Sequence, residues 1–172
     1  IQDEVFAEAK TLFTENIKRL NSVSHNGGII NEAYGLHPDA LTSYIETALW
    51  SSTDTDDEPM DSKYDISDVG DEFKMKAKSD LSDFIKKAEE EGVLEAYLDA
   101  WEGRGAWGQL GHNFWLSRNG HGAGFFDDQN AEPEVQEKMQ DIAETFGEAY
   151  LDIGHDDVVE EATVQKFRYE AG

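Results

Sequence analysis

Two histidines and two carboxylates fall within a single stretch of eighteen residues, 111–128, which reads GHNFWLSRNGHGAGFFDD. Imidazole and carboxylate groups can bind zinc, iron or manganese, and they can also exchange protons in general acid–base catalysis. The candidates for either role are His112, His121 and Asp127. No HExxH pair accompanies them, so we expect no bound metal and no cofactor. A catalytic or metal site at these three residues remains the alternative.

Arg118 is one of only four arginines in the chain and stands next to Asn119. A guanidinium at this position suits a bound carboxylate or phosphate, or an internal clamp on Asp127 or Asp128, and we favour the clamp. Glycines follow at alternate positions, where they allow tight turns and the close approach of a ligand. The GK[ST] and GxGxxG signatures of phosphate-binding loops are missing, so the glycines also fit a simple tight turn. The candidate ligand-pocket residues are Arg118, Asn119, Gly120 and Gly122.

The formal net charge of -24 is unevenly distributed along the chain. Residues 54–72 contain nine acidic residues and one lysine, net -8, and residues 127–161 contain thirteen acidic residues and one lysine, net -12. Such a surface repels nucleic acid and anionic membranes and attracts a basic partner. We therefore expect no direct binding to nucleic acid or membranes. The expected partner is a protein with a basic surface, such as the groove of a DNA- or RNA-binding protein.

Acidic residues recur at helical spacing between residues 134 and 148. At about 100° per residue they fall within a stripe of about 80° on a predicted helix, opposite its apolar face. With a rise of about 1.5 Å per residue, the row would be about 21 Å long, comparable with a run of backbone phosphates. The alternative is an ordinary solvated face. The candidate binding residues of the acidic loop and of this helix are Asp54, Asp56, Asp57, Glu58, Asp61, Glu134, Glu137, Asp141, Glu144 and Glu148.

Apolar residues repeat at steps of three and four in five segments, which predicts amphipathic helices. The stretch 107–126 fits either a helix or a hairpin across NGHG. We favour a helix to Arg118, then a glycine loop and a short strand at 124–126. Two short runs at 149–153 and 158–161 predict a C-terminal β-hairpin. The expected helices cover residues 3–20, 38–50, 69–91, 94–102 and 133–146.

Length and composition indicate one domain. A chain of 172 residues with nine phenylalanines, six tyrosines and four tryptophans can bury one sizeable core. It has no cysteine, no signal-peptide pattern, and no apolar run near the roughly 20 residues that span a bilayer, so we expect a cytoplasmic protein. We expect an α+β fold, mainly α, with about five helices and a small C-terminal β-hairpin. The single compact domain would cover residues 1–172, with a partly mobile acidic loop at 51–68.

The segment 111–128, together with YIETALWSSTD at 44–54 and the hairpin-like C-terminus, resembles a family of small proteins encoded by bacteriophages and some plasmids. The central signature of that family reads approximately GHDFWLTRNGHGAGFWD. Asn113 stands where the family pattern has Asp, which removes a carboxylate base or ligand at that position, and Phe126 replaces Trp. The resemblance implies a phage accessory setting, in which small acidic proteins often occupy host DNA-binding proteins such as restriction, CRISPR or nuclease machinery.

These observations predict a phage-encoded acidic protein of the host cytoplasm that binds and inhibits a host nucleic-acid-binding or defence protein by DNA mimicry. The loop 54–72 and the helix 133–146 would form its binding face. The alternative is a small enzyme or ligand-binding protein that uses the histidine, arginine, asparagine and aspartate side chains of segment 111–128. A third hypothesis is a structural protein that forms homo-oligomers.

Overall fold

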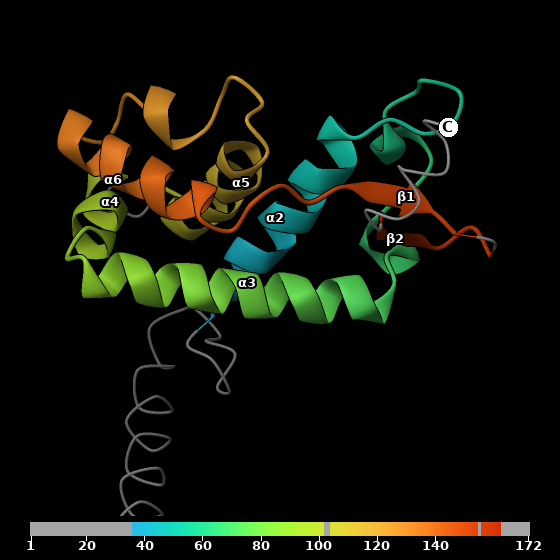
Figure 1. The fold of residues 1–172 in the computed structure, drawn as a ribbon, viewed down its shortest axis with the longest axis horizontal. Helices are drawn as coiled ribbons and strands as arrows, with labels where there is room; N and C mark the ends of the chain where they lie inside the picture. Colours follow the sequence, from blue (N-terminus) through green and yellow to red (C-terminus); the bar gives the residue numbers. More distant parts are fainter. Residues whose placement is uncertain (1–35, 102–103, 155, 163–172) are drawn as a thin grey trace, which may run out of the picture. The chain divides into compact units, whose positions relative to one another are not determined.

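The computed structural model describes residues 36–101, 104–154 and 156–162. The chain divides into two compact units, Ile1–Pro38 and Asp39–Gly172, and nearly all of the described residues belong to the second. Within the described ranges, five α-helices and one two-stranded antiparallel sheet give a mainly α fold of the α+β class, as predicted (Figure 1). The expected helix at 3–20 lies outside the described residues, so a single domain over 1–172 stays a prediction.

Four helices confirm the predictions from hydrophobic periodicity. Two of them begin at a proline, Pro38 and Pro133, because the missing N–H costs nothing in the first turn of a helix. A third is followed by Gly92, whose φ of 73° suits the end of a helix. The four helices are α2 (Pro38–Ser51), α3 (Asp71–Glu90), α4 (Leu94–Ala100) and α6 (Pro133–Glu144).

The helix favoured for the central stretch is also confirmed, as α5 (Ala106–Arg118), but the strand expected at 124–126 is wrong. In its place lies a short 3-10 helix, η4 (Phe125–Asp127). The hydroxyl oxygen of Ser117 accepts the N–H of Phe125 at 2.9 Å, and the carboxylate of Asp127 accepts the N–H of Gly124 at 2.8 Å. Because side chains satisfy the backbone locally, this segment needs no strand partner.

Aromatic side chains form the centre of the core. Phe84 of α3 stacks on Phe114 of α5, with ring centroids 4.3 Å apart, and on Phe125 of η4 at 5.5 Å. Phe146, just after α6, meets Phe114 edge-on at 5.2 Å. Figure 1 shows α3 running along the other elements, with α4 and α6 near one end of it and the hairpin near the other. Aromatic burial therefore holds α5 and η4 against α3.

The predicted C-terminal hairpin is confirmed. Strands β1 (Leu151–Ile153) and β2 (Val159–Glu161) pair antiparallel, with Asp152 opposite Glu160. The N–H of Gly70 donates to the carbonyl of Val159 at 2.9 Å and ties the hairpin to the start of α3. Between α2 and α3, the acidic loop contains two 3-10 helices, η2 (Met60–Ser62) and η3 (Ile66–Asp68), and its mobility stays a prediction. None of the helices in the described ranges is long and apolar enough to span a bilayer.

Candidate functional site

Arg118, at the end of α5, forms an internal clamp, and its partner is Asp80 rather than Asp127 or Asp128. Its side chain is 2% exposed, and its Nη1 lies 2.7 Å from Oδ2 of Asp80 on α3. Nη1 also donates to the hydroxyl of Tyr44 at 2.9 Å, while Nε and Nη2 donate to the carbonyls of residues 147 and 146. With these donors engaged, the guanidinium is part of the scaffold and is not presented to a ligand.

Asp128 is buried, at 7% exposure, and accepts three hydrogen bonds on one carboxylate oxygen. The donors are the hydroxyl of Tyr97 at 2.8 Å, Nε1 of Trp101 at 3.1 Å and Nδ2 of Asn113 at 2.9 Å. Burial and then the charge of Asp128 raise the pKa of the Tyr97 hydroxyl, so it remains a donor at neutral pH. The carboxylate is thus held by hydrogen bonds from α4, α5 and the segment after α4.

The remaining residues of the glycine-rich segment point to structural roles. Asn119 donates to the carbonyl of Trp115 at 3.0 Å and accepts the N–H of Ala149 at 2.8 Å, which joins α5 to the segment before β1. Gly120 and Gly122 have φ of 62° and 73°, which favours glycine. His121 is exposed. The candidate ligand-pocket residues Arg118, Asn119, Gly120 and Gly122 therefore do not converge on one open pocket.

His112 lines a pocket of about 610 Å³ between α2, α5 and the acidic loop. The hydroxyl of Thr47 donates to the carbonyl of Ser43 at 2.6 Å, so its oxygen is left to accept from Nδ1 of His112 at 2.9 Å. Burial lowers the pKa of the His112 imidazole below its usual value, and the charge of Asp127 offsets part of this effect. The imidazole is therefore neutral at pH 7, with its proton on Nδ1 and Nε2 left as an acceptor.

A metal site at His112, His121 and Asp127 has no support in this geometry. Within residues 36–101, 104–154 and 156–162, no group of three or more histidine, aspartate or glutamate side chains is arranged to hold a metal ion. His112 lines the pocket, His121 is exposed, and one carboxylate oxygen of Asp127 caps the N–H of Gly124. Of these three residues, His112 is the one that lines the pocket of about 610 Å³.

The two acidic segments form separate surfaces, because α6 and the acidic loop lie at opposite ends of α3 (Figure 1). In the loop, Lys63 pairs with Asp54 and Asp56, and Asp54 also accepts the N–H of Glu58. Asp54 is therefore part of the loop structure rather than a free surface charge. The exposed carboxylates of the loop are Asp56, Asp57, Glu58, Asp61 and Asp65.

On α6 the predicted stripe is shorter than expected. The helix ends at Glu144, and Gly147 with φ of 70° turns the chain away, so Glu148 does not lie on the helix. Glu148 instead accepts from the hydroxyl of Tyr150. The row from Glu134 to Glu144 then spans about 15 Å at about 1.5 Å per residue. Its four members, all exposed, are Glu134, Glu137, Asp141 and Glu144.

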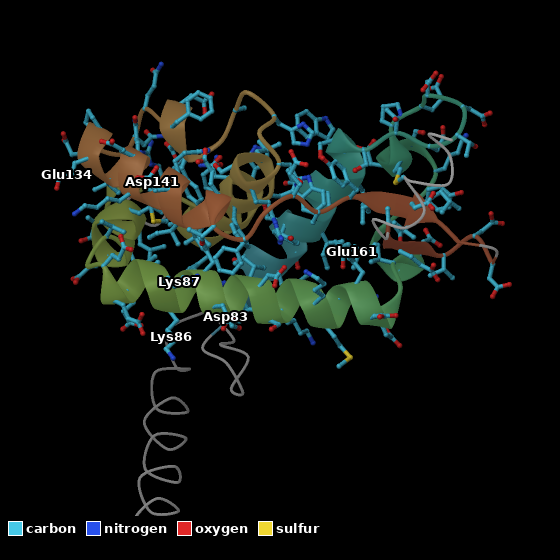
Figure 2. All side chains as sticks on the ribbon, in the orientation of Figure 1. Asp83, Lys86, Lys87, Glu134, Asp141 and Glu161 are labelled. Carbon is cyan, nitrogen blue, oxygen red and sulfur yellow. The ribbon has the colours of Figure 1, made fainter. Side chains whose placement is uncertain are left out.

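The C-terminal end of α3 extends this stripe. Exposed Glu90 and Glu91 line a surface hollow of about 300 Å³ together with Asp141 of α6. Lys87 lines the same hollow, and its ammonium lies 4.7 Å from the ring of Phe146. Figure 2 shows Lys87 between α3 and α6, whereas Lys86 lies on the far side of α3. The name "acidic face" is used below for Glu90, Glu91, Glu134, Glu137, Asp141 and Glu144.

Several residues of these sites could not be identified from the sequence. Glu90 ends α3 and Glu91 follows it, in a segment where lysines offset most of the acidic charge, and only the packing of α3 on α6 brings the two carboxylates to Asp141. Thr47, the partner of His112, lies in the segment 44–54, which no catalytic or binding motif marks. That segment does contact the glycine-rich one, through Tyr44 to Arg118, Thr47 to His112 and Ser51 to Trp115.

In comparisons with known proteins, no family model, curated protein or solved structure matches the chain. Its function is therefore inferred from side-chain geometry and charge.

Proposed function

We propose that this chain is an acidic accessory protein that binds and inhibits a nucleic-acid-binding protein, with the acidic face in place of backbone phosphates. The observation that carries the proposal is the convergence of carboxylates from two helices on one surface, where Glu90, Glu91 and Asp141 line a single hollow. Phosphate-binding proteins recognise such charge with lysine and arginine side chains. The acidic loop, at the other end of α3, is not part of this surface.

Three charges of the acidic face, those of Glu90, Glu91 and Glu144, lie at the C-terminal ends of helices and oppose helix stability. Carboxylates at the C-terminal end of a helix interact unfavourably with its dipole, each by about 0.3–1 kcal/mol. Glu89, Glu90 and Glu91 all stand at the end of α3, and the last turn of α6 contains Glu144 and no basic residue. Local rules of this kind are broken most often where function requires it. This supports binding over a merely solvated face.

Counter-charges on the acidic face are few. Lys138 lies 3.4 Å from Glu134, but this pair is exposed and contributes little. Lys87 faces Phe146 at the back of the hollow. Within residues 36–101, 104–154 and 156–162, six carboxylates therefore face two lysines, and the field of this surface is negative. The lysine and arginine side chains of a basic groove could pair with these carboxylates along the length of the row.

The test is competition with DNA. The immobilised chain is exposed to a bacterial lysate, since the resemblance to phage proteins points to a bacterial partner, and bound proteins are eluted with duplex DNA at fixed ionic strength. The proposal expects known DNA- or RNA-binding proteins to be released by the duplex and by salt. Bound proteins that resist both eluents would overturn it.

The alternative function, ligand binding or catalysis, is favoured by one observation only. His112 is neutral, has an acceptor nitrogen and lines a pocket of about 610 Å³, a volume within the usual range for small-molecule sites. The hydroxyl of Thr47 is already bound to Ser43, so it is not available as a nucleophile. The geometry supports binding at this pocket better than a reaction.

A further inference from the structure

The pocket beside His112 has an unusual lining. Three carboxylates, two aromatic rings and the neutral imidazole face it, and no lysine or arginine of the described part of the chain contributes to its wall. The indole of Trp50 is 56% exposed and lies 6.2 Å from the His112 ring, tilted by 32°. The exposed ring face of a tryptophan in a concave site can bind a cation through a cation–π interaction. The lining residues used below are Glu46, Trp50, Asp61, Tyr64, Asp65 and His112.

Among the residues that the structure describes, no lysine or arginine forms an ion pair with Glu46, Asp61 or Asp65 of this lining. Lys63 is the one basic residue of the loop 54–72, and it pairs with Asp54 and Asp56 outside the pocket. Asp65 caps η3, where it accepts from Ser67, and these hydrogen bonds lower the pKa of its carboxyl group. Asp65 is therefore a fixed negative charge. Glu46 and Asp61, both exposed, are the two carboxylates available to a ligand.

We propose that this pocket, which is separate from the acidic face, binds a guanidinium group that stacks on Trp50 and pairs with Glu46 and Asp61. A guanidinium suits the lining better than an ammonium, because it is planar, stacks on aromatic rings and donates to several acceptors in one plane. Nε2 of His112 supplies one further acceptor. The pocket is much larger than a guanidinium alone, so the ligand also has an alkyl stem and a flanking group.

Two sources can present this group, namely an arginine residue of a protein and a free alkylguanidine. The probes are N-acetyl-arginine amide for the first and agmatine for the second, and N-acetyl-citrulline amide is the neutral control of nearly identical shape. Binding to the full chain is followed by NMR through the indole N–H signal of Trp50, assigned with the Trp50→Phe variant. Saturable shifts with either charged probe support the proposal, and the tighter probe identifies the source.

The control probe and two variants complete the experiment. The citrulline derivative should bind about tenfold more weakly or worse than the arginine derivative, since it lacks the charge. The variant Glu46→Gln/Asp61→Asn should lose affinity for the charged probes by about tenfold. The matched variant Asp56→Asn/Asp57→Asn removes the same number of charges from the acidic loop, outside the pocket, and should leave affinity unchanged. Equal binding of citrulline, equal loss in both variants, or no shift of the Trp50 signal would overturn the proposal.

Discussion

Nη1 of Arg118 lies 2.7 Å from Oδ2 of Asp80, and this part-buried ion pair joins α5 to α3. The same guanidinium holds Tyr44 of α2 and the carbonyls of Phe146 and Gly147 after α6. It also lies over the ring of Phe114, 5.4 Å from its centroid. One cation therefore fixes four segments around the core, and the arginine of the glycine-rich segment is a structural residue.

Removal of this cation should be costly. We expect Arg118→Met to lower the free energy of unfolding by about 3–5 kcal/mol, because it leaves Asp80 without its buried partner and two carbonyls without a donor. Urea denaturation followed by circular dichroism measures the change. The control is Lys76→Met, which removes the exposed partner of Asp80 at 3.1 Å and should cost less than about 1 kcal/mol. Similar losses in both variants would contradict the assigned role.

Asn113 links two buried polar groups of the core. Nδ2 of Asn113 donates to Asp128 at 2.9 Å and to the hydroxyl of Tyr97 at 3.0 Å. In the variant Asn113→Asp, two carboxyl groups would meet in the core and would have to share a proton. A carboxyl pKa raised in the folded state gives stability below the unfolded pKa, and that stability is lost as pH rises through the folded pKa.

The Asn113→Asp variant should therefore be less stable than wild type by about 3 kcal/mol at pH 7, and the deficit should shrink towards pH 4. Urea denaturation over this pH range gives the measurement. Asn113→Ala serves as the control, because it removes the same donors without adding a charge, and its deficit should be nearly independent of pH. A deficit of Asn113→Asp that does not change with pH would show that the two carboxyl groups do not interact.

Local signals predicted the fold well where one face of a helix is buried. The apolar residues of α3 and α6 recur at helical spacing, which predicted both helices. Pro133 begins α6, and Gly92 follows the end of α3. α5 gave a weaker signal, because it is buried on nearly all sides and no polar face marks its period. The strand expected at 124–126 failed because Ser117 and Asp127 bind the backbone there, and such local competition is not visible in a pattern of apolar residues.

The sites were less predictable, since they depend on contacts between distant residues. Arg118 was expected to clamp an acid nearby in sequence, but packing brings it to Asp80 on another helix. Gly111 is the first residue of the segment 111–128, and packing explains why a glycine stands there. A Cβ at this position would overlap the carbonyl of Ala40 on α2. Charge runs located two acidic segments in the sequence, but only the fold separates the loop from α6 and brings Glu90 and Glu91 to Asp141.

Protonation of His112 at acidic pH should destabilise the fold. Burial lowers the pKa of His112 in the folded state, so the unfolded chain binds a proton more readily, and stability falls as pH drops through the usual histidine range near 6.5. NMR titration should place the pKa of His112 below the usual histidine value near 6.5. In urea denaturation from pH 7.5 to 5.5, His112→Gln should show a smaller loss of stability than wild type. An identical loss would assign the effect to other groups.

The most direct test of the central claim compares binding by two variants of equal charge. Glu137→Gln/Asp141→Asn/Glu144→Gln removes three negative charges from the acidic face, and Asp56→Asn/Asp57→Asn/Glu58→Gln removes three from the loop. Capture of DNA-binding proteins from a bacterial lysate is quantified for both variants and for wild type, all shown to be folded by circular dichroism. We expect the first variant to lose the partners that duplex DNA displaces, and the second to retain them. Retention by the first variant, or equal loss by both, would contradict the acidic face as the binding surface.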